Sequence, residues 1–312
     1  MPLNAWYSPS IRIYGKRGSQ FATAADLPDR EARVFIKDVE GWLKKLRKLT
    51  TGDALIQEID GSGRICYIIQ ADPLKGSMAT QYAPNPADKT DMLRRQLAGM
   101  AAPITPPKKI LIQDKNLMAG AYNDLKNKLT TVGAPLHKTE TYTNFLQLIA
   151  NLSAAGLQNP VRRITEVTGK PIHVVTDWMT GNDSPDRTSY FKIVAAFYDY
   201  FPRGVGVDTC VQITPADDKD SPEYIQLGHE LIHAWRMMTG RRIVGGNSWE
   251  EEAMTVGLSP FANLRFTENH LREEAKLKSR LKYGGMVAAG TEWMDITHKQ
   301  PVEASPVMFQ SR

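Results

Sequence analysis

The chain has 312 residues, of which 42% are hydrophobic and 23% are charged, and its formal net charge is +5. This length is enough for one sizeable hydrophobic core, and the composition is typical of a soluble protein. Because the positive excess is small and scattered, it does not indicate nucleic-acid binding, and we expect no nucleic-acid partner.

The cysteine content and the hydrophobic runs indicate in which cellular compartment the protein works. The two cysteines, Cys66 and Cys210, lie in apolar strand-like runs, so we expect buried free thiols and a reducing compartment. No apolar run reaches membrane-spanning length, and the N-terminus lacks the hydrophobic core of a signal peptide. We therefore expect no membrane span and no general secretory export, although a specialised secretion route would leave weaker marks.

The N-terminal part combines an irregular segment with helices. Residues 1–28 show little hydrophobic periodicity and are predicted to be a flexible segment that could serve as a secretion leader. Apolar residues at helical spacing predict a helix over 29–49 and a shorter one over 53–59. After a tight turn, residues 64–70 are predicted to form a buried strand.

The middle of the chain, residues 72–188, is predicted to be an accessory or inserted region. Residues 72–107 are rich in proline, which is typical of a surface excursion. The other predicted elements are helices over 88–100, 116–129 and 141–157, strands over 109–113 and 171–176, and an apolar segment over 188–200 whose type stays open.

Residues 221–240 contain the most informative pattern, SPEYIQLGHELIHAWRMMTG. Ser221 suits an N-cap and Gly240 a left-handed helix end, so a helix with both ends marked is predicted. His229 and His233 are four residues apart, which places both imidazoles on one face where they could bind one zinc ion. The other histidines lack such spacing and are predicted to be surface or packed residues: His137, His173, His270 and His298.

Glu230 follows the first histidine and would lie beside the metal, where its carboxylate could take a proton from a zinc-bound water. Zinc lowers the pKa of bound water from about 16 toward ~7 and polarises the carbonyl under attack. The His-Glu-x-x-His pattern can arise by chance, but the capped helix around it favours a metal site.

A catalytic zinc needs a third protein ligand. In the longer pattern that ends in a third histidine, the places for Gly and His are held here by Arg236 and Thr239, so the ligand must come from elsewhere. The run Glu250-Glu251-Glu252 supplies candidates for a ligand and for a carboxylate that supports a ligating histidine. An acidic helix start favoured by the helix dipole is the alternative, but it explains only one or two of the three.

A strand is predicted over residues 205–213, just before the histidine helix. In zinc proteases of this layout such a strand borders the cleft, where an extended peptide can pair with it. The alternative is an interior strand without substrate contact.

Four blocks follow one another in the last third of the chain: Gly228-His-Glu-Leu-Ile-His-Ala234, Glu251-Glu252-x-x-Thr255-Val-Gly257, Thr267-Glu268-Asn269-x-x-Arg272 and Arg280-x-x-Tyr283. In this order they resemble the NleD-type effector metalloproteases, which bacterial type III secretion delivers into host cells. The first, second and fourth blocks are also similar to the light chains of clostridial neurotoxins. The resemblance covers residues 221–285.

The resemblance implies which carboxylates complete the metal site. In the neurotoxin light chains the second Glu of the pair binds zinc and the first supports a histidine. This makes Glu252 the third ligand and Glu251 the supporting residue, although the opposite assignment stays open. Glu268 and Arg272 are one helical turn apart and are expected to support the ligands or to form a structural ion pair.

The last block implies a role for Arg280 and Tyr283, because the matching pair in those enzymes lies near the substrate carbonyl. We expect both to stabilise the oxyanion of the tetrahedral intermediate. Their i, i+3 spacing would let them reach one side of a helix. Alternatively, Arg280 is a surface charge and Tyr283 a packed ring.

Together these patterns predict an α+β, zincin-like fold, in which residues 29–312 form a zinc metalloprotease domain with a small mixed sheet and the histidine helix at the floor of a cleft. The resemblance implies a gluzincin-like Zn²⁺ endopeptidase that is secreted by a specialised bacterial system into the host cell cytoplasm, and a secretion chaperone could accompany it. Its substrates would be host proteins, with mitogen-activated protein kinases as the target class. A catalytically inactive zincin-like effector that binds host proteins and a domain with a non-proteolytic target are the alternatives.

Overall fold

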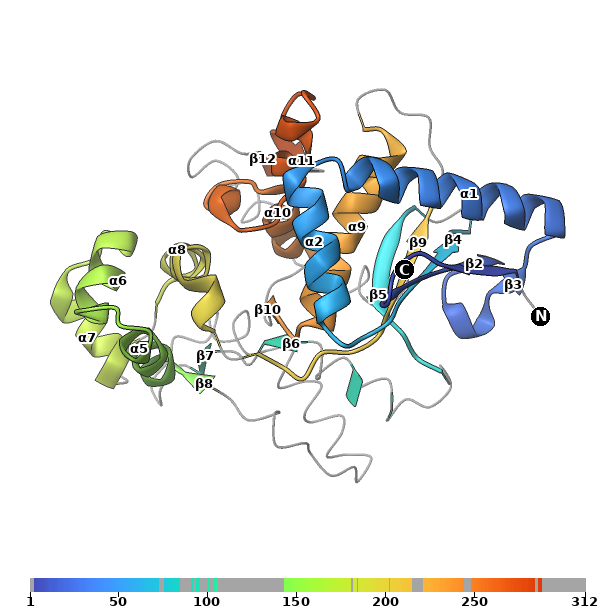
Figure 1. Ribbon diagram of the computed structural model, residues 1–312. Helices are drawn as coiled ribbons and strands as arrows, with labels where there is room; N and C mark the ends of the chain where they lie inside the picture. The colour runs from blue at the N-terminus through green and yellow to red at the C-terminus, as the bar shows by residue number, and fades with distance from the viewer. Residues whose placement is uncertain are drawn as a thin grey trace.

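A computed structural model describes residues 3–72, 76–84, 91, 94–95, 100–101, 104–105, 143–180, 182–183, 185–201, 203–214, 221–243, 248–283 and 286–287. Within them the chain combines a small mixed sheet with helices that pack against it, which confirms the predicted α+β class (Figure 1). One large hydrophobic cluster contains buried side chains of the central sheet together with buried side chains of the helices.

The central sheet contains strands β1 (Asn4–Trp6), β2 (Ile11–Arg17), β3 (Ala25–Asp26), β4 (Cys66–Gln70), β5 (Met78–Gln81) and β9 (Thr209–Ile213). Its order is β1-β2-β4-β9-β5, and β3 pairs with β2. Neighbours β2, β4 and β9 are parallel, whereas β5 runs antiparallel to β9. Among the described strands, β5 therefore forms one edge of the sheet and β9 lies in its interior.

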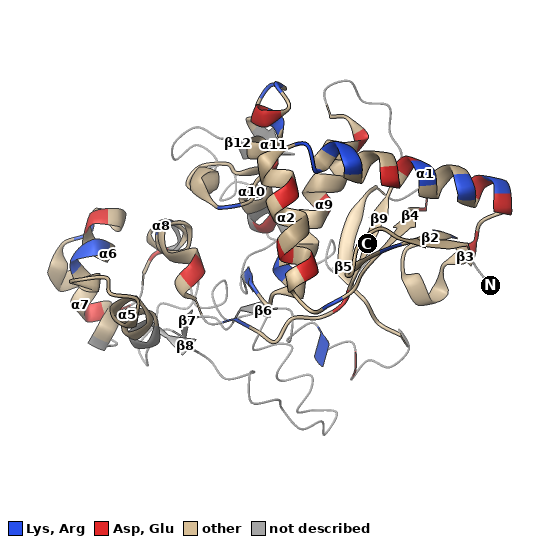
Figure 2. Ribbon diagram, viewed as in Figure 1, with Lys and Arg blue, Asp and Glu red and all other residues tan. Residues whose placement is uncertain are grey.

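Helices α1 (Asp29–Leu46) and α9 (Glu223–Met238) pack against the sheet, and α2 (Thr50–Gly61) packs against α9. Residues such as Phe35, Val39 and Leu43 recur at helical spacing on α1 and are buried, while charged residues occupy most of the other positions of that helix (Figure 2). Each such side chain contributes about 1.5–3 kcal/mol through its burial. The two N-terminal helices and the strand after them are confirmed.

The N-terminal segment differs from the prediction, because residues 4–26 form strands β1, β2 and β3 instead of an irregular stretch. On β2, Ile11 and Ile13 are fully buried and alternate with the partly exposed Arg12 and Tyr14. This period-two pattern is only a few residues long before Gly15 interrupts it, which is why it is easily missed. Strand β5 likewise arises in the proline-rich stretch that was expected to be a surface excursion.

Helices α5 (Phe145–Ala154), α6 (Pro160–Thr168), α7 (Ile172–Thr180) and α8 (Arg187–Phe197) lie together at the left of Figure 1, whereas the sheet lies at the right. The predicted strand over 171–176 is wrong: it belongs to α7, whose Val175 and Trp178 are buried three residues apart. Gly169 has a φ of 71° and ends α6, so α6 and α7 form a helix-turn-helix. The apolar segment over 188–200, whose secondary structure stayed open, is largely helical and belongs mostly to α8.

Of the three remaining strand pairs among the described residues, two join distant parts of the chain and one is local. Strand β6 (Met100–Ala101) pairs with β10 (Arg242–Ile243), β7 (Ile104–Thr105) pairs with β8 (Thr143–Asn144), and β11 (Lys282–Tyr283) pairs with β12 (Met286–Val287). The predicted strand over 109–113, the predicted helix over 116–129 and most of the predicted helix over 88–100 lie outside the described residues.

Both cysteines are confirmed as buried free thiols: Cys66 lies on β4 and Cys210 on β9. Burial raises the pKa of Cys66 to about 12, so this thiol is protonated and unreactive at neutral pH. As far as the described helices go, none has the length and apolar character needed to cross a bilayer.

Candidate metal centre

The histidine pattern lies on α9, which is buried on nearly every side from Leu227 to Met238. The helix begins at Glu223, one residue later than predicted, so the proposed N-cap Ser221 is wrong and Pro222 takes that position without a side-chain cap. The helix end agrees with the prediction, because Gly240 has a φ of 65°. A buried helix with defined ends holds its side chains in a fixed arrangement.

Two further helices bring carboxylates to α9: α10 (Ser248–Val256) carries Glu251 and Glu252, and α11 (Glu268–Glu274) begins at Glu268. Helix α11 can approach closely because residue 228 of α9 is glycine. A Cβ at that position would lie only 2.6 Å from Cδ1 of Leu271 on α11. The chain thus places its acidic residues against the histidines through close helix packing.

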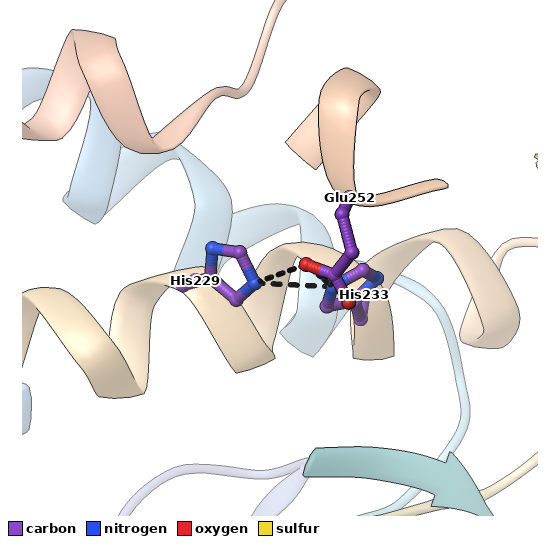
Figure 3. Close-up of side chains that lie close together, drawn as sticks. All are labelled: His229, His233 and Glu252. Atoms are coloured by element: carbon purple, nitrogen blue, oxygen red, sulfur yellow. Dashed lines mark hydrogen bonds and ion pairs between the residues drawn. The ribbon is translucent and has the colours of Figure 1, made fainter. Parts of the chain in front are cut away.

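Three predicted ligands converge in the structure: His229, His233 and Glu252 (Figure 3). Oε2 of Glu252 lies 2.9 Å from Nε2 of His229 and 3.4 Å from Nε2 of His233, and the two Nε2 atoms are 3.2 Å apart. Glu252 reaches down from α10, and its side chain is the most exposed of the three at 21%. Solvent therefore reaches Glu252 more than it reaches the two imidazoles.

The donor set fits a small tetrahedral cation. Protein ligands lie about 2.0–2.1 Å from zinc, so two of them in a tetrahedron are about 3.3–3.4 Å apart. The observed separations of 2.9, 3.2 and 3.4 Å are close to this value. Two imidazoles and one carboxylate also leave one position of such a centre for water or substrate.

The Nδ1 atoms of both histidines face carboxylates. Nδ1 of His229 lies 2.9 Å from Oε2 of Glu268, and Nδ1 of His233 lies 3.2 Å from Oε1 of Glu251. A carboxylate accepts a hydrogen bond, so each Nδ1 carries a proton, and in the neutral form of each ring the lone pair of Nε2 points inward. The structure thus places Glu251 against a histidine and Glu252 among the converging donors, as the family resemblance implies.

Arginines stabilise both supporting carboxylates. Glu268 is 1% exposed and accepts from Arg272 at 3.0 Å and from Arg280 at 3.1 Å. Burial alone would raise the pKa of Glu268, but the hydrogen bond from His229 and the guanidinium charges lower it to about 2. Burial would likewise raise the pKa of Glu251, but the nearby cation of Arg236 holds it well below its usual range. Both carboxylates are therefore ionised acceptors.

The converging atoms of His229, His233 and Glu252 are stabilised by a positive charge among them. With both Nδ1 atoms protonated, two lone pairs and a carboxylate oxygen point at one another, which is repulsive unless a proton or a metal ion lies among them. Burial alone would lower the pKa of His229, but the hydrogen bonds with Glu252 and Glu268 raise it to about 10. Protons and metal ions therefore compete for this position.

Glu230 is 7% exposed and follows His229 on α9. Burial is the main cause that raises the pKa of its carboxyl group to about 7. A group with such a pKa can accept a proton and return it near neutral pH, which suits a general base.

The predicted helical pair of Arg280 and Tyr283 is wrong in its geometry. Residue 280 lies in a loop and Tyr283 in β11, so the two are not on one side of a helix. Asn269 fixes this loop, because its side chain accepts from the backbone N–H of Arg280 and donates to its carbonyl. The guanidinium of Arg280 reaches Glu268, whereas the side chains of Tyr283 and Glu250 lie outside the described residues.

The hypothesis that a peptide pairs with residues 205–213 is also wrong. Only Thr209–Ile213 form the strand β9, all five residues are buried, and β9 already pairs with β4 and β5. The alternative of an interior strand is therefore correct.

Arg236 and Asn269 contribute to the site although sequence reasoning gave them no role. Arg236 donates to Glu251, and Asn269 holds the loop of Arg280. The available sign for Arg236 was its position three residues after His233, on the same side of the helix. The two other described histidines lie elsewhere: His173 is exposed on α7, and His270 is on α11.

In a comparison with known families, residues 146–283 match the family model Peptidase_M91, which is described as an effector protein. The matched range runs from α5 to β11 and includes every converging donor described above. Neither the curated proteins nor the solved structures give a significant match.

Proposed function

We propose that the chain is a member of the Peptidase_M91 family of effector proteins, whose model matches residues 146–283, and that it is a zinc-dependent endopeptidase with a zincin-like fold. The observation that carries the proposal is the convergence of Nε2 of His229, Nε2 of His233 and a carboxylate oxygen of Glu252 within a few ångströms. Such a mixed nitrogen and oxygen set on a buried helix is typical of catalytic zinc sites of the gluzincin type.

His229, His233 and Glu252 would hold the ion, with Glu268 and Glu251 orienting the two imidazoles. A bound zinc ion would supply Lewis acidity toward the scissile carbonyl and toward water. Glu230 is proposed to accept the proton of the attacking water and then to donate it to the departing amine.

Arg280 and Tyr283 are proposed to steady the oxyanion, as the family resemblance implies. The side chain of Arg280 is 38% exposed and is anchored on Glu268, which also supports His229. Because Glu268 contacts both Arg280 and His229, it would keep the proposed oxyanion donor at a fixed distance from the proposed metal ligand.

Substrate would lie along β5 (Met78–Gln81). No described strand pairs with the outer edge of β5, and α9 packs directly against this strand. An extended peptide that adds to this edge would run past the helix that carries the ligands. Main-chain hydrogen bonds would thus hold the peptide independently of its sequence.

The proposal includes a bacterial effector that a type III system secretes, with or without a chaperone, and that cleaves host proteins in the host cell cytoplasm. Host signalling kinases such as mitogen-activated protein kinases are proposed as the target class. These finer points rest on the resemblance of the four sequence blocks, and the family description supports the role of an effector alone.

The test is cleavage of host proteins by the wild-type protein and by two variants of α9. Glu230→Gln removes the proposed base but keeps the size of the side chain, and Glu223→Gln makes the same change in the first turn of the helix. We expect new N-termini in a host lysate with wild type and Glu223→Gln, and a loss of about 10²-fold or more with Glu230→Gln. Full activity of a metal-loaded Glu230→Gln protein would refute the assigned base, and the absence of zinc-dependent fragments with wild type would refute the protease.

A further inference from the structure

Arg236 is a buried cation next to the candidate metal centre, and the proposed reaction steps do not include it. It lies on α9 three residues after His233 and is 1% exposed. One guanidinium nitrogen, Nη1, donates to Oε1 of Glu251 at 2.9 Å and to Oγ1 of Thr255 at 2.5 Å. A single nitrogen therefore holds two acceptors on α10.

The same two acceptors face His233. Oε1 of Glu251 lies 3.2 Å and Oγ1 of Thr255 lies 3.3 Å from Nδ1 of the imidazole. The hydroxyl of Thr255 donates to the backbone carbonyl of Glu251 at 2.8 Å, which leaves its oxygen lone pairs for Nδ1 and for Arg236. Both groups that can accept the Nδ1 proton are thus fixed by one guanidinium.

Arg236 does not gain complete hydrogen bonding at this position. Its Nε is buried and has no hydrogen-bond partner among the described residues. A buried donor without a partner lowers stability. At this position the guanidinium leaves one donor without a partner, while Nη1 makes hydrogen bonds to both Glu251 and Thr255.

We propose that Arg236 is a positioning residue for the metal centre: by fixing Glu251 and Thr255 it keeps the proton of His233 on Nδ1 and its ring oriented, so that Nε2 faces His229 and Glu252. The inference rests on the proposed metal-dependent function. Without the guanidinium, Glu251 and Thr255 lose their common donor, and the imidazole loses its fixed partners. Arg236 itself touches neither metal nor substrate.

The test compares metal affinity, measured by competition of Zn²⁺ with a chelator, in three single variants. Arg236→Met removes the donor and should weaken Zn²⁺ binding about 10–100-fold. Arg236→Lys keeps a cation with rotatable donors and should restore affinity to within about fivefold of wild type. Arg241→Met is the matched control, because Arg241 is also largely buried but donates to Asp199 and packs on Trp235. This control should leave Zn²⁺ affinity unchanged.

A spectroscopic readout separates positioning from a general loss of structure. The visible absorption of the Co²⁺-loaded protein reports ligand geometry, so Arg236→Met should change it and Arg241→Met should not. Equal Zn²⁺ affinity and equal Co²⁺ spectra in folded Arg236→Met and Arg241→Met would overturn the inference.

A double variant keeps the test decisive if Arg236→Met does not fold. Arg236→Met combined with Glu251→Gln removes both members of the buried ion pair, which is far less disruptive than removing one. If Arg236 acts through Glu251, adding Arg236→Met to Glu251→Gln should weaken Zn²⁺ binding less than about threefold. A full 10–100-fold further loss would contradict the relay through Glu251.

The outcome also separates this inference from the proposed function. If wild type binds Zn²⁺ tightly, His229→Ala abolishes binding and Arg236→Met does not weaken it, only the positioning role fails. If His229→Ala binds Zn²⁺ as well as wild type does, the metal centre itself is wrong.

Discussion

Gly228→Ala is expected to destabilise the protein and to loosen the metal centre, although alanine is normally the better helix former. The added Cβ would lie 2.6 Å from Cδ1 of Leu271 and 3.0 Å from Cδ2 of Leu46. Both leucines are fully buried, so neither can turn into solvent. Leu271 lies on α11, and its displacement would also move Glu268 away from the imidazole of His229.

The magnitude follows from two opposing contributions. Overpacking of a buried site lowers the free energy of unfolding by about 1–3 kcal/mol. Replacing a helical glycine by alanine raises it by about 1 kcal/mol. We therefore expect a net loss of about 1 kcal/mol in Gly228→Ala. Gly41→Ala is the matched control on α1, because a Cβ there meets nothing within 4 Å, and it should gain about 0.5–1 kcal/mol.

Urea unfolding of both variants measures this difference, which should be about 2 kcal/mol with opposite signs relative to wild type. Adding Leu271→Val to Gly228→Ala shortens the obstructing side chain and should recover part of the loss. A Gly228→Ala protein as stable as Gly41→Ala would refute the close contact of α9 with α11. Zn²⁺ affinity should fall together with stability, since Glu268 is carried on the displaced helix.

Other predictions concern pH, helix capping and partners. Zn²⁺ affinity should fall as the pH is lowered, because the ligating imidazoles must lose protons to bind, and binding in unbuffered solution should release protons; a pH-independent affinity would contradict the ligand set. Asp186 caps α8 by accepting from the backbone and hydroxyl of Ser189 and pairs with Lys170 at 2.8 Å, so Asp186→Ala should lose ~1 kcal/mol at neutral pH. Burial raises the pKa of Asp186, but the hydrogen bonds from Lys170 and Ser189 lower it overall, so the folded-state pKa lies below the unfolded value. The difference in unfolding free energy between wild type and Asp186→Ala, measured in urea, should therefore be complete above pH ~4 and vanish as the pH falls through the folded-state pKa. The helix-turn-helix group should not bind duplex DNA, since residues 145–201 contain five basic and five acidic side chains and Arg163 pairs with Glu166; salt-sensitive retention on DNA would refute this.

The sequence was informative where a local pattern determines the structure. The helices over residues 29–61 and the histidine helix have apolar positions at helical spacing, and the spacing of four residues from His229 to His233 suffices to place two imidazoles on one face. The nearness of Glu252 depends on the packing of α10 on α9, which no spacing within one helix specifies. The run of three glutamates supplied candidates for the third ligand, and only the resemblance to known metalloproteases selected Glu252 among them.

Errors occurred where tertiary packing overrides local preference. Residues 172–176 are rich in β-branched side chains, yet they belong to α7 because Val175 and Trp178 both face the core at helical spacing. The assignment of β9 as a substrate-binding strand failed because edge and interior positions depend on strand order. That order places β5, from a stretch without a clear strand pattern, outside β9.

The roles of arginines were hardest to predict, because a long side chain selects its partner only in the folded protein. Arg280 lies eight residues after Arg272, yet both reach Glu268 because the loop before Arg280 folds back onto α11. Arg236 on α9 reaches Glu251 on the neighbouring helix α10. Charge alone assigned neither contact.

The metal content of the purified protein tests the central claim most directly. Wild type should contain one tightly bound Zn²⁺ per chain, and Glu252→Ala should lose most of it while keeping its fold. Glu273→Ala, an acidic residue on α11 away from the converging donors, should keep the full amount. A wild-type protein without zinc, or a Glu252→Ala protein that retains it at wild-type affinity, would contradict a metal centre built from His229, His233 and Glu252.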